Sequence, residues 1–236
     1  MYSKNALEVH SRYAAMEGSE QVALLFSIQE LIKHLDQTSP RKVLELGGGI
    51  GTLTECLLRF SKSDLTVVEN NEFCLNKMKK NLESFRHFNL VTTYENLAPY
   101  SDFDMLIIDV NNGIFNVKSL LFSAKNVSVI FVEGHHLAHR LNICQTMLEK
   151  NFIQEFEDLR PKRGIKGCGF FYVRPDRSFC HWKAKQSFLL TYTPFLVSKF
   201  MIRIRYRTGS FLDSISFVPG LSKLRRLWFG KIPWNF

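Results

Sequence analysis

The sequence predicts an α/β fold in which a mostly parallel β-sheet is covered by helices. Short apolar segments alternate with helical ones along residues 41–134, a glycine-rich turn joins the first of them to a helix, and two further strands close the pattern. A chain of 236 residues is long enough to bury one such core and to carry additional segments at its ends.

The first apolar segment, residues 41–46, runs into the turn Gly47-Gly48-Gly49-Ile50-Gly51, and a helix is expected from Thr52 to Phe60. Glycines permit positive φ angles and let backbone N–H groups approach a ligand closely. The positive N-terminal end of the following helix points at the same place. This unit therefore predicts a binding site for part of a nucleotide-like cofactor at the carboxyl end of the strand.

Apolar runs predict the remaining elements of the sheet. Strands are expected at residues 64–70, 89–95, 103–110 and 128–134, with a polar helix at 71–86 and another helix after 134. Residues 152–161 and 165–173 are expected to form an antiparallel pair, because the turn between them is short. Residues 1–37 indicate two helices that pack on the sheet, and Met16–Gln21 are placed either near the cofactor or simply against the sheet.

The pattern Glu45-x-Gly47-x-Gly49-x-Gly51 resembles motif I of the class I S-adenosylmethionine-dependent methyltransferases. A dinucleotide fingerprint would need a glycine where Thr52 stands. Glu69, at the end of the second strand, matches motif II, in which a carboxylate accepts the ribose hydroxyls. The resemblance covers roughly residues 19–175. It implies a Rossmann-like sheet of seven strands in the order 3-2-1-4-5-7-6, with helices on both faces and a terminal hairpin.

The resemblance also implies site residues. The expected cofactor contacts are Glu45, Gly47, Gly48, Gly49, Gly51, Glu69, Asn70, Glu95 and Asn96. Asp109 ends the fourth strand, where the family presents the methyl group, so it is a candidate for the acceptor site. His135 follows the fifth strand and either takes a proton from an acceptor hydroxyl or is a solvated or helix-capping histidine.

Related classes fit the sequence less well. Metal-assisted O-methyltransferases carry an Asp-Asn pair where Glu133-Gly134 stands, so no metal is expected. The glycine loop also resembles the first motif of ribosomal RNA adenine dimethylases, but the Asn-Leu-Pro-Tyr motif that these need after strand four is missing there. Aminopropyltransferases of the spermidine synthase type need an Asp pair near strand four, and Asp104 would lie at the wrong end of that strand.

The C-terminal segment differs in charge from the rest of the chain. Residues 176–236 hold 11 basic and 2 acidic side chains, whereas residues 1–175 hold 20 of each. Basic residues beside Trp and Phe suit an anionic membrane surface or RNA, and they also suit a layer docked on the sheet with its charges exposed. We therefore expect a helical cap at 1–40, a methyltransferase domain at 41–175 and a basic, aromatic-rich extension at 176–236.

The expected function is methyl transfer from S-adenosylmethionine to a hydroxyl of a small molecule or a glycan. Five scattered cysteines without a Cys-x-x-Cys pair indicate reduced thiols, and the sequence shows neither an apolar leader nor a spanning segment, so a cytosolic enzyme with optional peripheral membrane contact is expected. Two alternatives remain. One is an RNA methyltransferase that uses the basic extension, and the other is a membrane-associated binding module without catalysis.

Overall fold

The computed structural model describes residues 2–93, 102–110, 126–134, 143–144, 146–147, 153–159 and 167–173. In chain order its elements are α1 (Tyr2–Ala14), the 3-10 turn η1 (Ser19–Gln21), α2 (Leu25–Thr38), β1 (Lys42–Leu46), α3 (Thr52–Phe60), β2 (Asp64–Val68), α4 (Glu72–Asn81), β3 (Asn89–Val91), β4 (Met105–Ile108), β5 (Val129–Val132), β6 (Ile153–Leu159) and β7 (Cys168–Val173).

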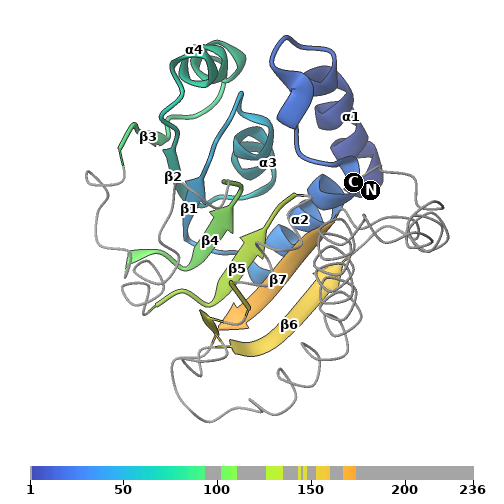
Figure 1. The fold of residues 1–236 in the computed structure, drawn as a ribbon, viewed down its shortest axis with the longest axis vertical. Coiled ribbons are helices and arrows are strands. Elements are labelled where there is room, and N and C mark those ends of the chain that lie inside the picture. Colours follow the sequence, from blue (N-terminus) through green and yellow to red (C-terminus); the bar gives the residue numbers. More distant parts are fainter. Residues whose placement is uncertain are drawn as a thin grey trace, which may run out of the picture. The chain divides into compact units, whose positions relative to one another are not determined.

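The seven strands form one sheet in the order β3-β2-β1-β4-β5-β7-β6 (Figure 1), which confirms the order implied by the sequence. Strands β1 to β5 are parallel, and β7 runs antiparallel to both of its neighbours. Leu46 is in register with Val68 on one side and with Ile108 on the other. The carboxyl ends of β1, β2 and β4 therefore meet at one edge of the sheet, where a ligand site is expected in open α/β sheets.

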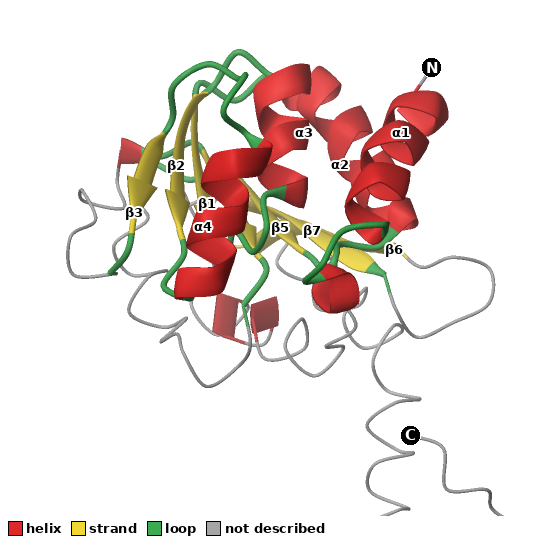
Figure 2. Ribbon diagram, turned by 90° about the horizontal axis from the view of Figure 1, so that it is seen from above, coloured by secondary structure: helices red, strands yellow, loops and turns green. Residues whose placement is uncertain are grey.

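Both faces of the parallel strands are buried, as their near-continuous apolar sequences require. On one face, a cluster of strand side chains packs with the helices; it includes Val43, Val67, Met105, Ile107, Val129, Phe131 and Phe170. Helices α1, α2 and α3 lie together over this face (Figure 2), and α4 adds Met78 and Leu82 to the same core. The N-terminal helices thus share one hydrophobic core with the sheet.

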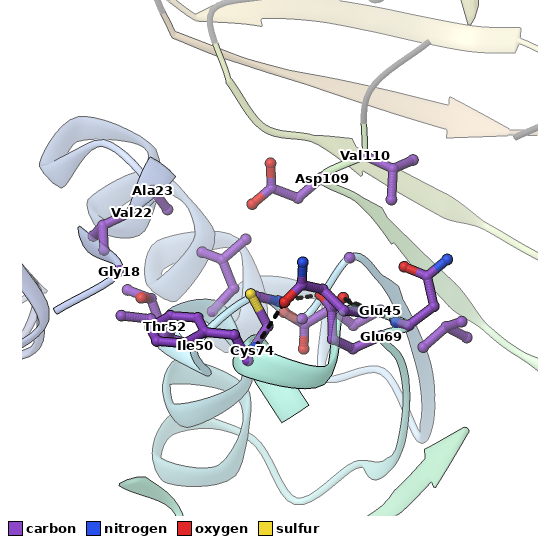
Figure 3. A pocket seen from close by; sticks show the side chains of 18 of the residues that line it. Gly18, Val22, Ala23, Glu45, Ile50, Thr52, Glu69, Cys74, Asp109 and Val110 are labelled. Atoms are coloured by element: carbon purple, nitrogen blue, oxygen red, sulfur yellow. Dashed lines mark hydrogen bonds between the residues drawn. The ribbon is translucent and has the colours of Figure 1, made fainter. Parts of the chain in front are cut away.

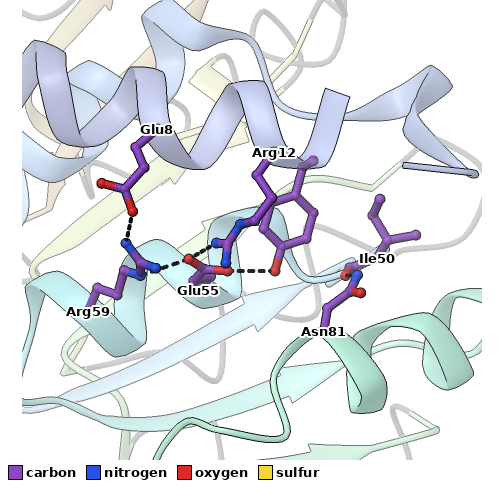
Figure 4. A network of polar contacts seen from close by, with 7 residues as sticks. Glu8, Arg12, Ile50, Glu55, Arg59 and Asn81 are labelled. Atoms are coloured by element: carbon purple, nitrogen blue, oxygen red, sulfur yellow. Dashed lines mark hydrogen bonds and ion pairs between the residues drawn. The ribbon is translucent and has the colours of Figure 1, made fainter. Parts of the chain in front are cut away.

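A buried carboxylate fastens α1 to α3 (Figure 4). Glu55 is fully buried, accepts a hydrogen bond of 2.9 Å from the hydroxyl of Tyr13 and pairs with Arg12. Its Oε1 atom also lies 2.8 Å from Nε of Arg59, whose Nη1 atom lies 2.7 Å from Oε1 of Glu8. Because the middle and the carboxyl-terminal end of α1 are tied to α3, the segment that follows α1 is held in place.

The element boundaries follow the sequence, with shorter strands than the apolar runs suggest. Helix α3 spans the predicted residues, and α4 begins where the side chain of Asn71 accepts the N–H of Cys74, a favourable N-cap. The predicted helix at 71–86 is therefore too long, because α4 ends at Asn81. Among the described helices, none combines the length and the apolar character needed to cross a membrane.

Candidate active site

Three of the glycines after β1 adopt positive φ angles: 87° at Gly47, 53° at Gly49 and 103° at Gly51. A Cβ atom at Gly47 would lie 2.3 Å from the backbone oxygen of Asp109, and one at Gly48 would lie 2.3 Å from Cε of Met78. These two glycines are required by the packing of the protein itself. A Cβ atom at Gly49 would meet no atom of the described residues within 4 Å, so the bare backbone at this position faces open space in that part of the structure.

That open space is a cavity of about 580 Å³. Four parts of the chain line the cavity. The segment between α1 and α2 contributes Gly18, Glu20, Val22 and Ala23, and the stretch from β1 through the glycine loop into α3 contributes Glu45, Gly47, Gly48, Gly49, Ile50, Thr52 and Leu53. The end of β2 and the start of α4 contribute Val68, Glu69, Asn70, Asn71, Phe73 and Cys74, and the end of β4 contributes Asp109 and Val110. Figure 3 shows residues of all four parts around the hollow, with Asp109 on the side opposite Cys74. The volume suits a ligand of nucleoside size.

Glu69 binds the glycine loop directly. Its Oε2 atom accepts the N–H of Gly49 at 2.8 Å, and its Oε1 atom accepts the N–H groups of Asn70 and Asn71 at 2.9 and 2.7 Å. The side chain is nearly buried, yet it lines the cavity. Three backbone donors therefore fix the orientation of this carboxylate at the cavity wall before any ligand is present.

Glu45 lies at the end of β1 and is fully buried. Its Oε2 atom accepts a 2.8 Å hydrogen bond from the hydroxyl of Thr54, whereas its Oε1 atom has no hydrogen-bond partner in the described part of the chain. Burial raises the pKa of Glu45 to about 8, against the opposing effect of the Thr54 hydrogen bond. A buried acceptor without a partner costs free energy, so this oxygen is suited to a donor or a cationic group supplied by a ligand.

Asp109 directly follows β4, and its N–H donates to the carbonyl of Leu46 at 2.9 Å. Burial raises the pKa of Asp109 well above its usual range, and the neighbouring carboxylates of Glu133, Glu45 and Glu69 add to this effect. The part of the cavity wall that the structure describes includes four acidic side chains and no Lys, Arg or His. Such a wall favours a ligand that carries positive charge.

The structure brings seven of the nine expected cofactor residues to the cavity or its loop, and it places Asp109 across from them. Gly51, which does not line the cavity, starts α3 and packs near Leu82. Glu95, Asn96 and His135 lie outside the described residues, so their roles stay predictions. In the described part of the chain, no group of three or more His, Cys, Asp and Glu side chains is arranged to hold a metal ion.

Sequence reasoning anticipated one part of the site incompletely and missed another. It left open that Met16–Gln21, a range that includes Gly18, lies near the cofactor, but it did not name Val22 and Ala23, which line the cavity together with Gly18. Gly18 has φ 88°, and a glycine between two helices is a signal for such a turn. The other is Glu133, whose contacts with Asp109 and with the start of α2 join segments far apart in the sequence.

Residues 26–112 match the family described as the methyltransferase small domain, and this range contains the glycine loop, Glu69 and Asp109. This match identifies a methyltransferase domain within the chain, and the strand order is that of the class I methyltransferase fold. S-adenosylmethionine is the cofactor expected for such a domain. No curated protein matches the chain in sequence.

Two solved structures illustrate the shared fold. The N-methyltransferase NodS from Bradyrhizobium japonicum, in complex with S-adenosylhomocysteine, has 14% identity and a TM-score of 0.51, over 73% of this chain and 100% of its own. The O-methyltransferase TomG from Streptomyces achromogenes, in complex with S-adenosylmethionine, has 14% identity and a TM-score of 0.52, over 73% of this chain and 89% of its own. At this identity the likeness concerns the fold, and it extends to both N- and O-methyltransferases.

Three observations fit the cofactor to the cavity of this methyltransferase. The backbone at Gly49 is bare and open, the carboxylate of Glu69 is oriented beside it, and Glu45 presents a buried oxygen without a partner. The acidic wall also matches the positive charge of a sulfonium nucleoside.

Proposed function

We propose that this methyltransferase transfers a methyl group to a hydroxyl of a small molecule or a glycan, and that Asp109 faces the acceptor. The observation that carries the proposal is the position of Asp109, which lies at the carboxyl end of β4 in the cavity wall. Figure 3 shows it across the hollow from Cys74 and from the start of α4. A hydroxyl acceptor must lose a proton, and burial raises the pKa of Asp109 above its usual range, which makes its carboxylate a stronger base than an ordinary one.

In this proposal the cofactor lies on the bare backbone of Gly49. Glu69 accepts ribose hydroxyls, Asn70 borders them, and the buried oxygen of Glu45 receives a cationic group of the ligand. Gly47 and Gly48 let the loop approach β4 and α4 closely enough to keep this surface open. When bound, the cofactor supplies an electrophilic methyl group, and the protein holds the acceptor in line with it.

Glu95 and Asn96 are proposed to contact the adenine ring, and His135 remains a second candidate for the base. The cytosolic location and the contact of residues 176–236 with an anionic membrane surface or with nucleic acid also belong to the proposal. The RNA-methyltransferase alternative rests on those residues, which lie outside the described part of the chain.

The proposal is tested with S-adenosylmethionine that carries a labelled methyl group. The purified protein is incubated with panels of hydroxylated small molecules, glycans and RNA, and the label is followed into each. We expect label in a hydroxyl compound, and we expect Asp109→Asn to lower kcat while the affinity for S-adenosylhomocysteine is kept. Label found only in RNA would contradict the proposal in favour of the second function, and cofactor binding without any transfer would favour the non-catalytic module.

A further inference from the structure

Glu133 lies beside Asp109, because Ile108 and Val132, which precede them, are in register at the ends of β4 and β5. The N–H of Glu133 donates to the carbonyl of Ile108 at 3.1 Å. Glu133 is 7% exposed, and its carboxyl group raises the pKa of Asp109 through its charge and a side-chain hydrogen bond. Glu133 is not part of the cavity wall, so any influence on a bound acceptor passes through Asp109.

The same carboxyl group also holds the beginning of α2. Oε1 of Glu133 accepts the backbone N–H of Leu24 at 3.0 Å, and Leu24 is the N-cap residue of that helix. Val22 and Ala23, which come just before it, line the cavity. Glu133 therefore contacts the acceptor side of the cavity through Asp109 and the opposite chain segment through Leu24.

Two hydrogen-bonded carboxyl groups need one proton between them, because two carboxylates offer only acceptors. The N–H of Leu24 and the positive N-terminal end of α2 stabilise a negative charge on Glu133. Among the described residues, the other titratable groups that act on Asp109 are Glu45 on β1 and Glu69, which directly follows β2, and both are acidic. This arrangement places the shared proton on Asp109 and the charge on Glu133.

We propose that Glu133 is a positioning residue, which accepts the hydrogen bond of Asp109 and keeps one proton and one negative charge at the acceptor side of the cavity. This inference rests on the proposed function of Asp109. In the transfer step, the acceptor O–H bond breaks and its proton passes to Asp109, while the proton of Asp109 passes to Glu133. The bond from the acceptor oxygen to the methyl carbon forms as the carbon–sulfur bond breaks, and that electron pair stays on sulfur.

The pair is tested by carbon-13 NMR titration of the side-chain carboxyl groups in the full chain, with the Asp109 signal assigned through Asp109→Asn. In Glu133→Gln we expect the acid dissociation constant of Asp109 to increase about tenfold or more, because the neighbouring charge is removed. Glu20→Gln, which neutralises another acid of the cavity wall, is the matched control and should leave Asp109 unchanged.

If Asp109 titrates as in the wild type in Glu133→Gln while the melting temperature falls, Glu133 only stabilises the start of α2, and the proposal is overturned. If Glu133→Gln does not fold, Asp109→Ala gives the reciprocal test: Glu133 then loses the hydrogen bond from the protonated Asp109, so its signal must titrate at higher pH. An unchanged Glu133 signal again overturns the pair. The titration needs no turnover, so its outcome is separate from that of the methyl-transfer assay.

Discussion

The backbone N–H of Gly49 donates a 2.8 Å hydrogen bond to Oε2 of Glu69, and this bond joins the glycine loop to the end of the next strand. A carboxylate offers about four lone-pair sites, and the N–H groups of Gly49, Asn70 and Asn71 use three of them. The loop and the carboxylate are therefore set relative to each other in the free protein. A ribose hydroxyl then finds an acceptor that needs little reorganisation.

Gly49→Ala should weaken cofactor binding while destabilising the fold less than Gly47→Ala does. The added methyl group meets no protein atom within 4 Å, but it projects from the cavity wall at φ 53°, which costs a non-glycine residue about 1–2 kcal/mol. We expect the affinity for S-adenosylhomocysteine to fall tenfold or more in calorimetry.

Gly47→Ala is the matched comparison. Its methyl group would lie 2.3 Å from the backbone oxygen of Asp109, which cannot move aside as a flexible side chain can. This variant should lose several kcal/mol of unfolding free energy in urea. If Gly47→Ala were as stable as the wild type, or if Gly49→Ala bound the ligand normally, the assignment of the two glycines would be wrong.

Glu69→Gln should reduce ligand affinity about tenfold or more while keeping the side-chain volume. One carboxylate oxygen becomes an NH₂ group, which must face either the N–H of Gly49 or those of Asn70 and Asn71. Glu72→Gln, an exposed acid in the first turn of α4, is the control and should bind S-adenosylhomocysteine as the wild type does. Equal affinities for both variants would remove Glu69 from the site.

Glu45→Gln should change how stability depends on pH. The native state keeps the proton of Glu45 up to a pKa of about 8, whereas the unfolded chain loses it near 4.5. Unfolding releases a proton between these values, so rising pH favours the unfolded wild type in this window, and a glutamine has no such dependence. In urea titrations, we expect the free energy of unfolding of Glu45→Gln, relative to that of the wild type, to be higher at pH 8 than at pH 5. If the difference in unfolding free energy between the two proteins were the same at both pH values, Glu45 would not be held protonated in the native state.

Glu55→Ala should destabilise the fold by about 2–4 kcal/mol, because it removes the buried acceptor shared by Arg12, Tyr13 and Arg59. Glu8→Ala breaks an ion pair of the same network, but its side chain is 60% exposed, so only a small loss of stability is expected. Thermal unfolding of both variants checks the contrast. Equal losses would mean that burial of Glu55 is not what fastens α1.

The sequence predicted the sheet because each parallel strand is a short apolar run with a turn signal after it. It also predicted the position of α3 to the residue, since Gly51 precedes Thr52 and Ser61 follows Phe60. The strands proved shorter than the apolar runs at their carboxyl ends: β2 ends at Val68 and β4 at Ile108, and the residues that follow, Glu69 and Asp109, line the cavity.

Within the site, the glycines and Glu69 were readable because they lie next to each other in a local strand–loop–helix–strand unit. The contacts of Glu133 were not readable, since Leu24 lies 109 residues away from it in the chain. The need for glycine at position 48 was equally hidden, because it arises from the side chains of Met78 and Val67. Periodicity reports local structure, whereas such contacts depend on how the elements pack.

The central claim is that the bare backbone at Gly49 and the carboxylate of Glu69 form the cofactor site. Isothermal titration of the purified full chain with S-adenosylhomocysteine, beside the Gly49→Arg variant, tests it most directly. The account predicts saturable binding at one site in the wild type and no detectable binding in the variant, whose long side chain would enter the cavity. Absence of binding in the wild type, or equal binding by both proteins, would contradict it.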